Sequence, residues 1–254
     1  ASATERLRIT SSGQTKLNIS SNGALTEPLV LRNGGTGAGT NVGMVFYNGD
    51  ESSSGAGTLA KAISKHYKLF YLDTGKIYRY IAYLKLKFPK RFKSSFIESK
   101  IKSLTMKDLS KKILLSDKVG TEASVISQNK KLRKIVHSMQ LNYAYNPPKK
   151  YRGSCLDGRD ITYNIIPDAN FKFYITADIK TRAERRYKEL RTLNNKITYL
   201  DVLKSIKKRD KSDFNRKIAP LKKTKDSLLI NTTNLNKRAC FLKIKKIIDR
   251  KHNN

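Results

Sequence analysis

Glycine and hydroxyl residues gather at Ser53-Ser54-Gly55-Ala56-Gly57-Thr58, between an apolar stretch and a helical one. In such a setting, backbone N–H groups and a helix N-terminus can hold phosphate groups. The phosphate-loop pattern G-x-x-x-x-G-K-[ST], in the form with a further Gly before the Thr, would place Gly at position 50 and Lys at position 56. This chain has Asp50 and Ala56 there, so the segment alone is equally consistent with a flexible linker.

Charged groups that could bind a nucleotide follow in order along the chain. They are Asp73-Thr74-Gly75 with Arg79, Asp157-Gly158-Arg159-Asp160, Pro167-Asp168-Ala169, Arg182 with Arg185 and Arg186, and Arg209 with Asp213 and Arg216. Arginine suits phosphate because its planar fork binds two oxygens at once and stays charged. Each group also has a structural explanation, since aspartates cap helices or form turns and arginines line solvated helix faces.

Apolar runs that alternate with helical patterns would position these groups. The sequence predicts strands at 69–72, 154–156, 171–176 and 227–232, and helices at about 59–67, from 76, and at 122–145, 179–192, 198–210 and up to 250. Buried strands alternating with helices predict an α/β layered domain with a parallel sheet. Because open sheets of this kind bind ligands at the carboxyl ends of their strands, the charged groups are expected to converge there.

Residues 1–57 differ in composition from the rest of the chain. They hold four basic and four acidic residues and ten of the 14 glycines, so the whole net charge of +33 falls in residues 58–254. Short alternating runs between turn signals predict a β-rich arm over 1–50, which resembles segments of phage tail fibres and implies a structural role. We hypothesise a fusion in which the apolar run Val42–Tyr47 occupies the central slot of the following sheet.

Composition narrows the function classes. No run approaches the roughly 18 apolar residues of a membrane helix, and two cysteines are too few for a disulfide framework, so we expect a cytoplasmic protein. The charge of +33 could indicate nucleic-acid binding, but lysines on the polar faces of helices also indicate a general lysine bias. We favour the lysine bias and expect a monomer without nucleic-acid or membrane partners.

The blocks "LDTGKIYR", "LDGRDI", "PDA" and "RDKSDFNRKIAPL", in this order, resemble the cytidylate kinase family over about residues 52–250. The resemblance implies a three-layer P-loop kinase-like fold over 51–254, with a nucleoside monophosphate-binding insertion at about 85–150 and a lid at about 178–216. It also implies transfer of the γ-phosphoryl group of ATP to CMP or dCMP, with Mg²⁺.

The same resemblance assigns roles to individual residues. It implies that Arg159 and the lid arginines Arg182, Arg185 and Arg186 act in catalysis, that residues 53–58 form the ATP phosphate loop, and that the Thr58 hydroxyl lies beside Mg²⁺. It implies a CMP site made of Asp73, Arg79, Ser127, Arg133, Asp157, Arg159, Asp160, Arg209, Asp213 and Arg216.

The phosphate loop departs from the family at Ala56, where the lysine is missing, and Lys61 lies one helical turn further on, so its side chain is expected to point elsewhere. Loss of one such donor costs on the order of 3–4 kcal/mol of transition-state stabilisation. We therefore predict a weakened kinase. The alternatives are a basic nucleic-acid-binding protein or a viral structural protein that carries an inactive kinase-like domain.

Overall fold

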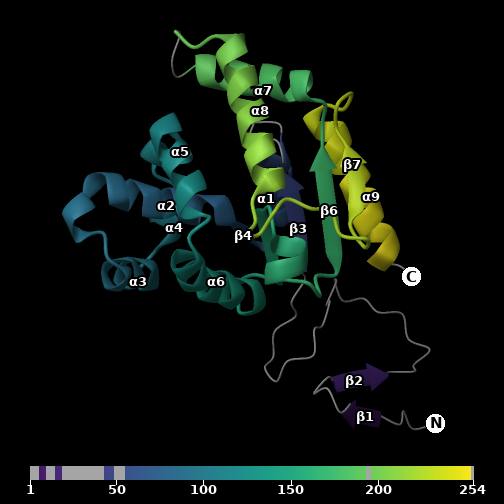
Figure 1. The fold of residues 1–254 in the computed structure, drawn as a ribbon. Coiled ribbons are helices and arrows are strands. Elements are labelled where there is room, and N and C mark those ends of the chain that lie inside the picture. Colours follow the sequence, from purple (N-terminus) through teal and green to yellow (C-terminus); the bar gives the residue numbers. More distant parts are fainter. Residues whose placement is uncertain (1–5, 10–14, 19–42, 49–54, 193–195, 253–254) are drawn as a thin grey trace.

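A five-stranded parallel sheet forms the centre of the chain, in the order β4-β5-β3-β6-β7 (Figure 1). The computed structural model describes residues 6–9, 15–18, 43–48, 55–192 and 196–252. The strands are β3 (Gly43–Asn48), β4 (Phe70–Asp73), β5 (Ser154–Gly158), β6 (Phe171–Thr176) and β7 (Leu228–Asn231). Every pairing among them is parallel, so the predicted parallel sheet is confirmed.

Helices cover both faces of the sheet, which gives the three layers expected from the sequence. On one face, apolar residues of α1 (Ala56–His66) and α9 (Lys237–His252) form one buried cluster with Cys155 and Phe173 of the strands. On the other face, α2 (Thr74–Lys87) packs with Leu72 and Leu156. Because side chains alternate along a strand, neighbouring residues such as Cys155 and Leu156 enter opposite layers.

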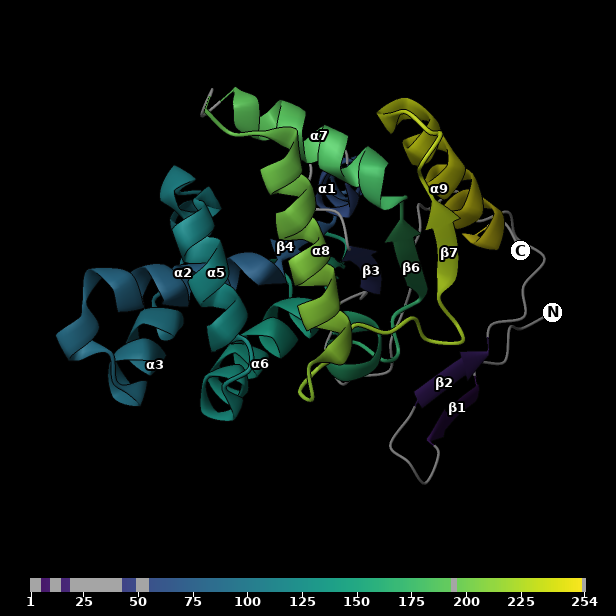
Figure 2. The ribbon, with the colours of Figure 1, turned by 45° about the horizontal axis from the view of Figure 1, so that its top comes forward.

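The segment between β4 and β5 forms a helical subdomain at one end of the sheet (Figure 2). It contains α2, α3 (Ser94–Lys102), α4 (Met106–Leu109), α5 (Asp117–Ile126) and α6 (Lys130–Tyr145). The single helix predicted over 122–145 is wrong, because α5 ends at Ile126 and the Asn129 side chain accepts a hydrogen bond from Leu132 N to begin α6.

Two consecutive helices that contact each other, α7 (Ile179–Arg191) and α8 (Tyr199–Asn215), stand over the carboxyl ends of the strands in the region predicted as a lid (Figure 1). Asp178 and Thr198 cap the two N-termini with their side chains. Helix α8 runs five residues beyond the predicted end at 210, so it carries Asp213 within its last turn.

The N-terminal arm contains an antiparallel pair, β1 (Arg6–Ile9) with β2 (Thr15–Asn18). Strand β3 pairs with both β5 and β6, so the expectation that the run near 42–47 fills the central slot is confirmed. The boundary between an arm at 1–50 and a kinase-like domain at 51–254 stays a prediction, and β3 lies before it while belonging to the sheet. Among the described residues, no helix has the length and apolar character to cross a membrane.

Candidate functional site

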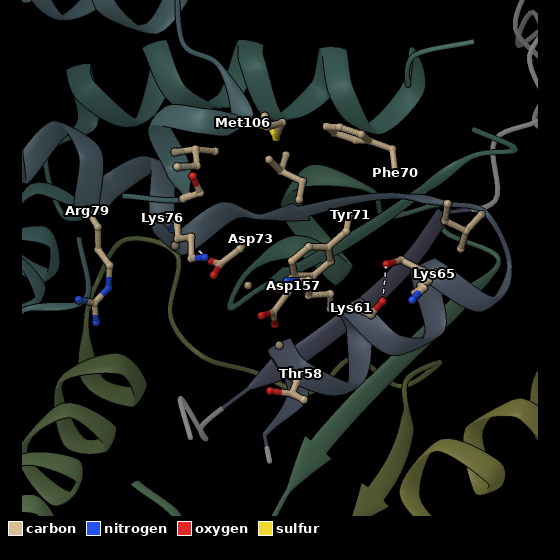
Figure 3. Close-up of a pocket in the computed structure, with 18 of the residues that line it drawn as sticks. Thr58, Lys61, Lys65, Phe70, Tyr71, Asp73, Lys76, Arg79, Met106 and Asp157 are labelled. Carbon is tan, nitrogen blue, oxygen red and sulfur yellow. Dashed lines mark hydrogen bonds between the residues drawn. The ribbon is translucent and has the colours of Figure 1, made fainter. Parts of the chain in front are cut away.

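A cavity of about 890 Å³ opens where α1 begins and where β4 and β5 end (Figure 3). Topology explains this position, because β4 and β5 are parallel neighbours and Asp73 lies directly opposite Asp157 at their carboxyl ends. The predicted site residues that line the cavity are Gly57, Thr58, Asp73, Arg79, Asp157, Arg159 and Arg186.

Helix α1 brings its first turn against Asp157. Gly55 is the N-cap and has no side chain with which to bind the first N–H groups of the helix. A Cβ placed on Gly57 would lie 2.8 Å from Asp157 Oδ2 and 3.4 Å from the Tyr71 hydroxyl oxygen. The approach of backbone, carboxylate and phenol therefore requires glycine at position 57. Ala56 is fully buried and packs in the core, and Ser53 and Ser54 lie outside the described residues.

Tyr71 was missed by the sequence analysis, which treated it as part of an apolar strand. Its side chain lies beside that of Asp157 in the cavity (Figure 3). Burial, together with the negative charges of Asp157 and Asp73, raises the pKa of Tyr71 well above its ordinary value. The neutral phenol can donate a hydrogen bond to Asp157, which holds that carboxylate beside α1.

Asp73 caps a helix, as one of the two explanations from the sequence has it, and its role in binding CMP stays a prediction. Its Oδ1 accepts a hydrogen bond from Lys76 N at 3.1 Å, so it caps α2, and it also lines the cavity. One turn further along α2, Arg79 Nη1 donates to Leu114 O at 2.8 Å. A Cβ on Gly120 would lie 3.0 Å from Arg79 Nη1, so Gly120 provides the space that this guanidinium occupies.

Three guanidinium groups surround the buried carboxylate of Asp213. Arg159 Nε donates a hydrogen bond to Asp213 Oδ2, and Arg216 Nη1 lies 3.5 Å from Oδ1. Arg209 Nε lies 3.7 Å from Oδ2. Only 5% of Asp213 is exposed, so the alternative of a solvated ion pair on the surface of α8 is wrong. The carboxylate gathers positive charge contributed by two elements distant in sequence.

The backbone after α8 fixes the direction of Arg216. Ala219 adopts the left-handed conformation with φ of 49°, which is uncommon for a residue with a side chain. Its carbonyl oxygen accepts a hydrogen bond from Arg216 Nε at 2.6 Å. Burial lowers the pKa of Arg216, while Asp213 opposes that effect, and the group stays charged at neutral pH. A turn thus aims one arginine into the cluster.

A second group joins Ser127, Arg133 and Asp160, which the sequence placed together only through the family resemblance. Arg133 Nη2 pairs with Asp160 Oδ2, and Arg133 Nη1 donates to Ser127 O at 3.1 Å. Arg216 Nη1 lies 3.5 Å from Ser127 Oγ, which connects this group to the Asp213 cluster. Asn164, which the sequence analysis did not single out, donates to Asp160 Oδ2 at 2.8 Å.

The three arginines of α7 separate in the structure. Arg182 binds Asp210 through two hydrogen bonds of 3.0 and 2.6 Å, which ties α7 to α8. Arg185 donates to Thr232 O at 2.8 Å, next to the end of β7. Arg186 pairs with Glu189 at 2.9 Å and lines the cavity. Of the three, Arg186 is therefore the one that faces the cavity in this arrangement.

The chain is similar in sequence to one family of known proteins. The family described as Cytidylate kinase matches residues 49–250. A cytidylate kinase of Bartonella tribocorum is 39% identical over 193 residues, covering 75% of this chain and 87% of that protein. One from Mesomycoplasma hyopneumoniae (strain 7448) is 34% identical over 214 residues, covering 79% and 91%. One from Clostridium tetani is 36% identical over 215 residues, covering 78% and 90%.

Proposed function

Since the chain belongs to the cytidylate kinase family, we propose that it transfers the γ-phosphoryl group of ATP to CMP or dCMP. The observation that carries this proposal is the convergence of separate guanidinium groups on one end of the sheet. Phosphoryl transfer needs little covalent chemistry from a protein, and it depends on positioned positive charge and on exclusion of water.

The acceptor half of the proposal rests on the cluster around Asp213 and on the group around Asp160. Arg79, Arg159 and Arg216 would hold the phosphate of CMP, because their guanidinium groups come from three different elements that meet near the cavity. Arg209 and Asp213 would contact the ribose. Ser127, Arg133 and Asp160 would recognise the cytosine edge, supported by their own hydrogen bonds.

The donor half rests on the first turn of α1. The N–H groups of this turn would bind phosphate oxygens through the backbone, since the N-cap Gly55 has no side chain that binds them. Thr58 lines the cavity, and its hydroxyl oxygen would be the ligand that this chain offers to Mg²⁺. Among the described residues, no group of three or more His, Cys, Asp or Glu side chains is placed to hold a metal ion. When bound, Mg²⁺ would neutralise charge on the phosphates.

Ala56 makes this chain a weakened member of the family in our proposal. The residue is the first of α1, and its methyl side chain offers the phosphates no ammonium group. ATP would still bind through backbone N–H groups, and the loss would fall on the rate. A deficit of about 3–4 kcal/mol corresponds to a rate reduction of about two to three orders of magnitude.

A nucleotide panel tests the proposal. Coupled detection of ADP release should show turnover with CMP or dCMP above that with UMP or AMP, and the lack of any preference would contradict it. Separately, millimolar CMP should raise the melting temperature by mass action, and Arg159→Ala or Arg216→Ala should abolish the shift. A CMP shift without turnover would leave the acceptor site standing and favour the alternative of an inactive kinase-like domain.

A further inference from the structure

The cavity extends beyond the nucleotide site into a groove along the outer edge of β4, which is the edge strand of the sheet. We call this extension the lysine groove. Five lysines line it, and they come from α1, the turn after α1, the start of α2 and the segment before β5: Lys61, Lys65, Lys68, Lys76 and Lys150. Lys61 lines the same cavity as Thr58, and whether its side chain points away from the phosphate loop stays a prediction.

The ammonium groups of these lysines have no acidic partner within the part of the chain that the structure describes. Lys61, Lys65, Lys68 and Lys150 are exposed, and Lys76 is half-buried. Lys61 and Lys65 are four residues apart on one face of α1 and lie on one side of Tyr71, while Lys76 lies on the other (Figure 3). Like charges so placed repel one another, and a multivalent anion would relieve that repulsion.

Lys68 adds an independent observation. It adopts a left-handed backbone conformation with φ of 56°, where glycine is the residue of lowest cost. The turn is fixed by Leu69 N donating to Ser64 O at 2.8 Å and by Arg152 N donating to Lys68 O at 2.9 Å. A residue with a left-handed backbone and a long cationic side chain therefore lines the groove. A role for that side chain accounts for lysine at a position that favours glycine.

From these observations we propose that the lysine groove binds linear inorganic polyphosphate, with one end of the chain directed toward the phosphate site. The ammonium groups of lysines attract phosphate through their charge and do not recognise a nucleotide base. Single-stranded nucleic acid fits less well, because it needs free aromatic faces for stacking. Phe70 already stacks on Tyr143 with ring centroids 5.0 Å apart, and the Tyr151 ring contacts Phe70 at 5.5 Å.

Calorimetric titration of the full chain with short inorganic polyphosphate tests the proposal. The triple variant Lys61→Gln, Lys65→Gln, Lys150→Gln should bind roughly 100-fold more weakly, since a lysine beside an anionic surface contributes about a factor of five. The matched control Lys237→Gln, Lys243→Gln, Lys246→Gln changes three exposed lysines on α9 and should bind like the parent chain. Lys68→Gly should weaken binding and also raise the melting temperature, because it relieves the left-handed strain.

Three results would overturn the proposal: equal losses in the triple variant and its control, tighter binding of a single-stranded oligonucleotide of the same charge, or no saturable binding at all. The first would assign the effect to overall charge and the second to nucleic acid. The melting shift caused by CMP should be the same in the triple variant as in the parent chain. The CMP shift depends on folding and on the acceptor site but not on the lysine groove. Failure of the groove proposal can therefore be distinguished from failure of the proposed kinase function.

Discussion

Replacing Asp213 by asparagine tests whether a buried carboxylate organises the arginines of the acceptor site. The change removes the negative charge that Arg159, Arg209 and Arg216 share at Asp213. Two unit charges about 4 Å apart interact by about 4 kcal/mol at an effective dielectric constant near 20. Measured losses on breaking buried pairs are about 3–5 kcal/mol, and asparagine keeps one acceptor oxygen. We therefore expect the free energy of unfolding to fall by about 3 kcal/mol, or about 6–12 °C in melting temperature.

Urea denaturation in a phosphate-free buffer measures this loss. Asp210→Asn is the matched control, because Asp210 pairs with Arg182 on the same helix but is more exposed, at 23% of its side chain against 7% for Asp213. It should cost about 1 kcal/mol. Inorganic phosphate should restore more stability to Asp213→Asn than chloride of equal ionic strength, because a bound anion replaces the missing charge. Equal losses in the two variants, or no selective rescue by phosphate, would refute the reasoning.

Three further changes probe the site. Gly158→Ala should lower the free energy of unfolding, measured by urea denaturation, by about 1–3 kcal/mol, because the new Cβ would lie 2.2 Å from Thr74 Oγ1. Gly75→Ala is the control and should cost less, because its Cβ would lie 3.3 Å from the nearest atom, Asp73 Oδ1. Tyr71 has a raised pKa in the folded chain, so its contribution to the free energy of unfolding should be complete below its ordinary pKa of 10.0 and should fall as the pH rises above it. Tyr71→Phe should make this fall less steep when melting temperatures are measured at alkaline pH. An unchanged slope would contradict the assignment. Ala56→Lys should raise turnover of CMP about 100- to 1,000-fold in the ADP-release assay, and background turnover with intact CMP binding would show that residues 50–58 are a linker.

The sequence predicted the layers of the fold well because periodicity reports burial directly. The strand at 171–176 was predicted with the same bounds that β6 shows, since its apolar run contains neither glycine nor proline. The break between α5 and α6 was missed, although Asn129 is a favoured residue at a helix N-terminus and could have indicated it. The polar run at 127–131 around Asn129 was read as part of the helix instead of as its interruption.

The site was predicted less completely, because the partners of its charged groups are distant in sequence. Nothing near Arg185 indicates that its guanidinium binds Thr232 O, 47 residues away. Likewise, the spacing of Arg209 and Asp213 on one helix gives no sign that Arg159 joins them from the end of β5. Tyr71 and the lysine groove depend on β4 being an edge strand, which is a property of the sheet order and not of the local sequence.

The central place of β3 has a consequence for how the chain is made. Its two partners begin at Ser154 and Phe171, more than 100 residues after β3 ends at Asn48. At about 5–20 residues per second, synthesis needs roughly 5–20 s after β3 is complete before β5 exists. During that interval both edges of an apolar strand lack their final neighbours, and the long loop must close before either pairing forms. The sheet therefore assembles late, and synthesis speed or a holding chaperone will influence how much of the chain reaches this fold.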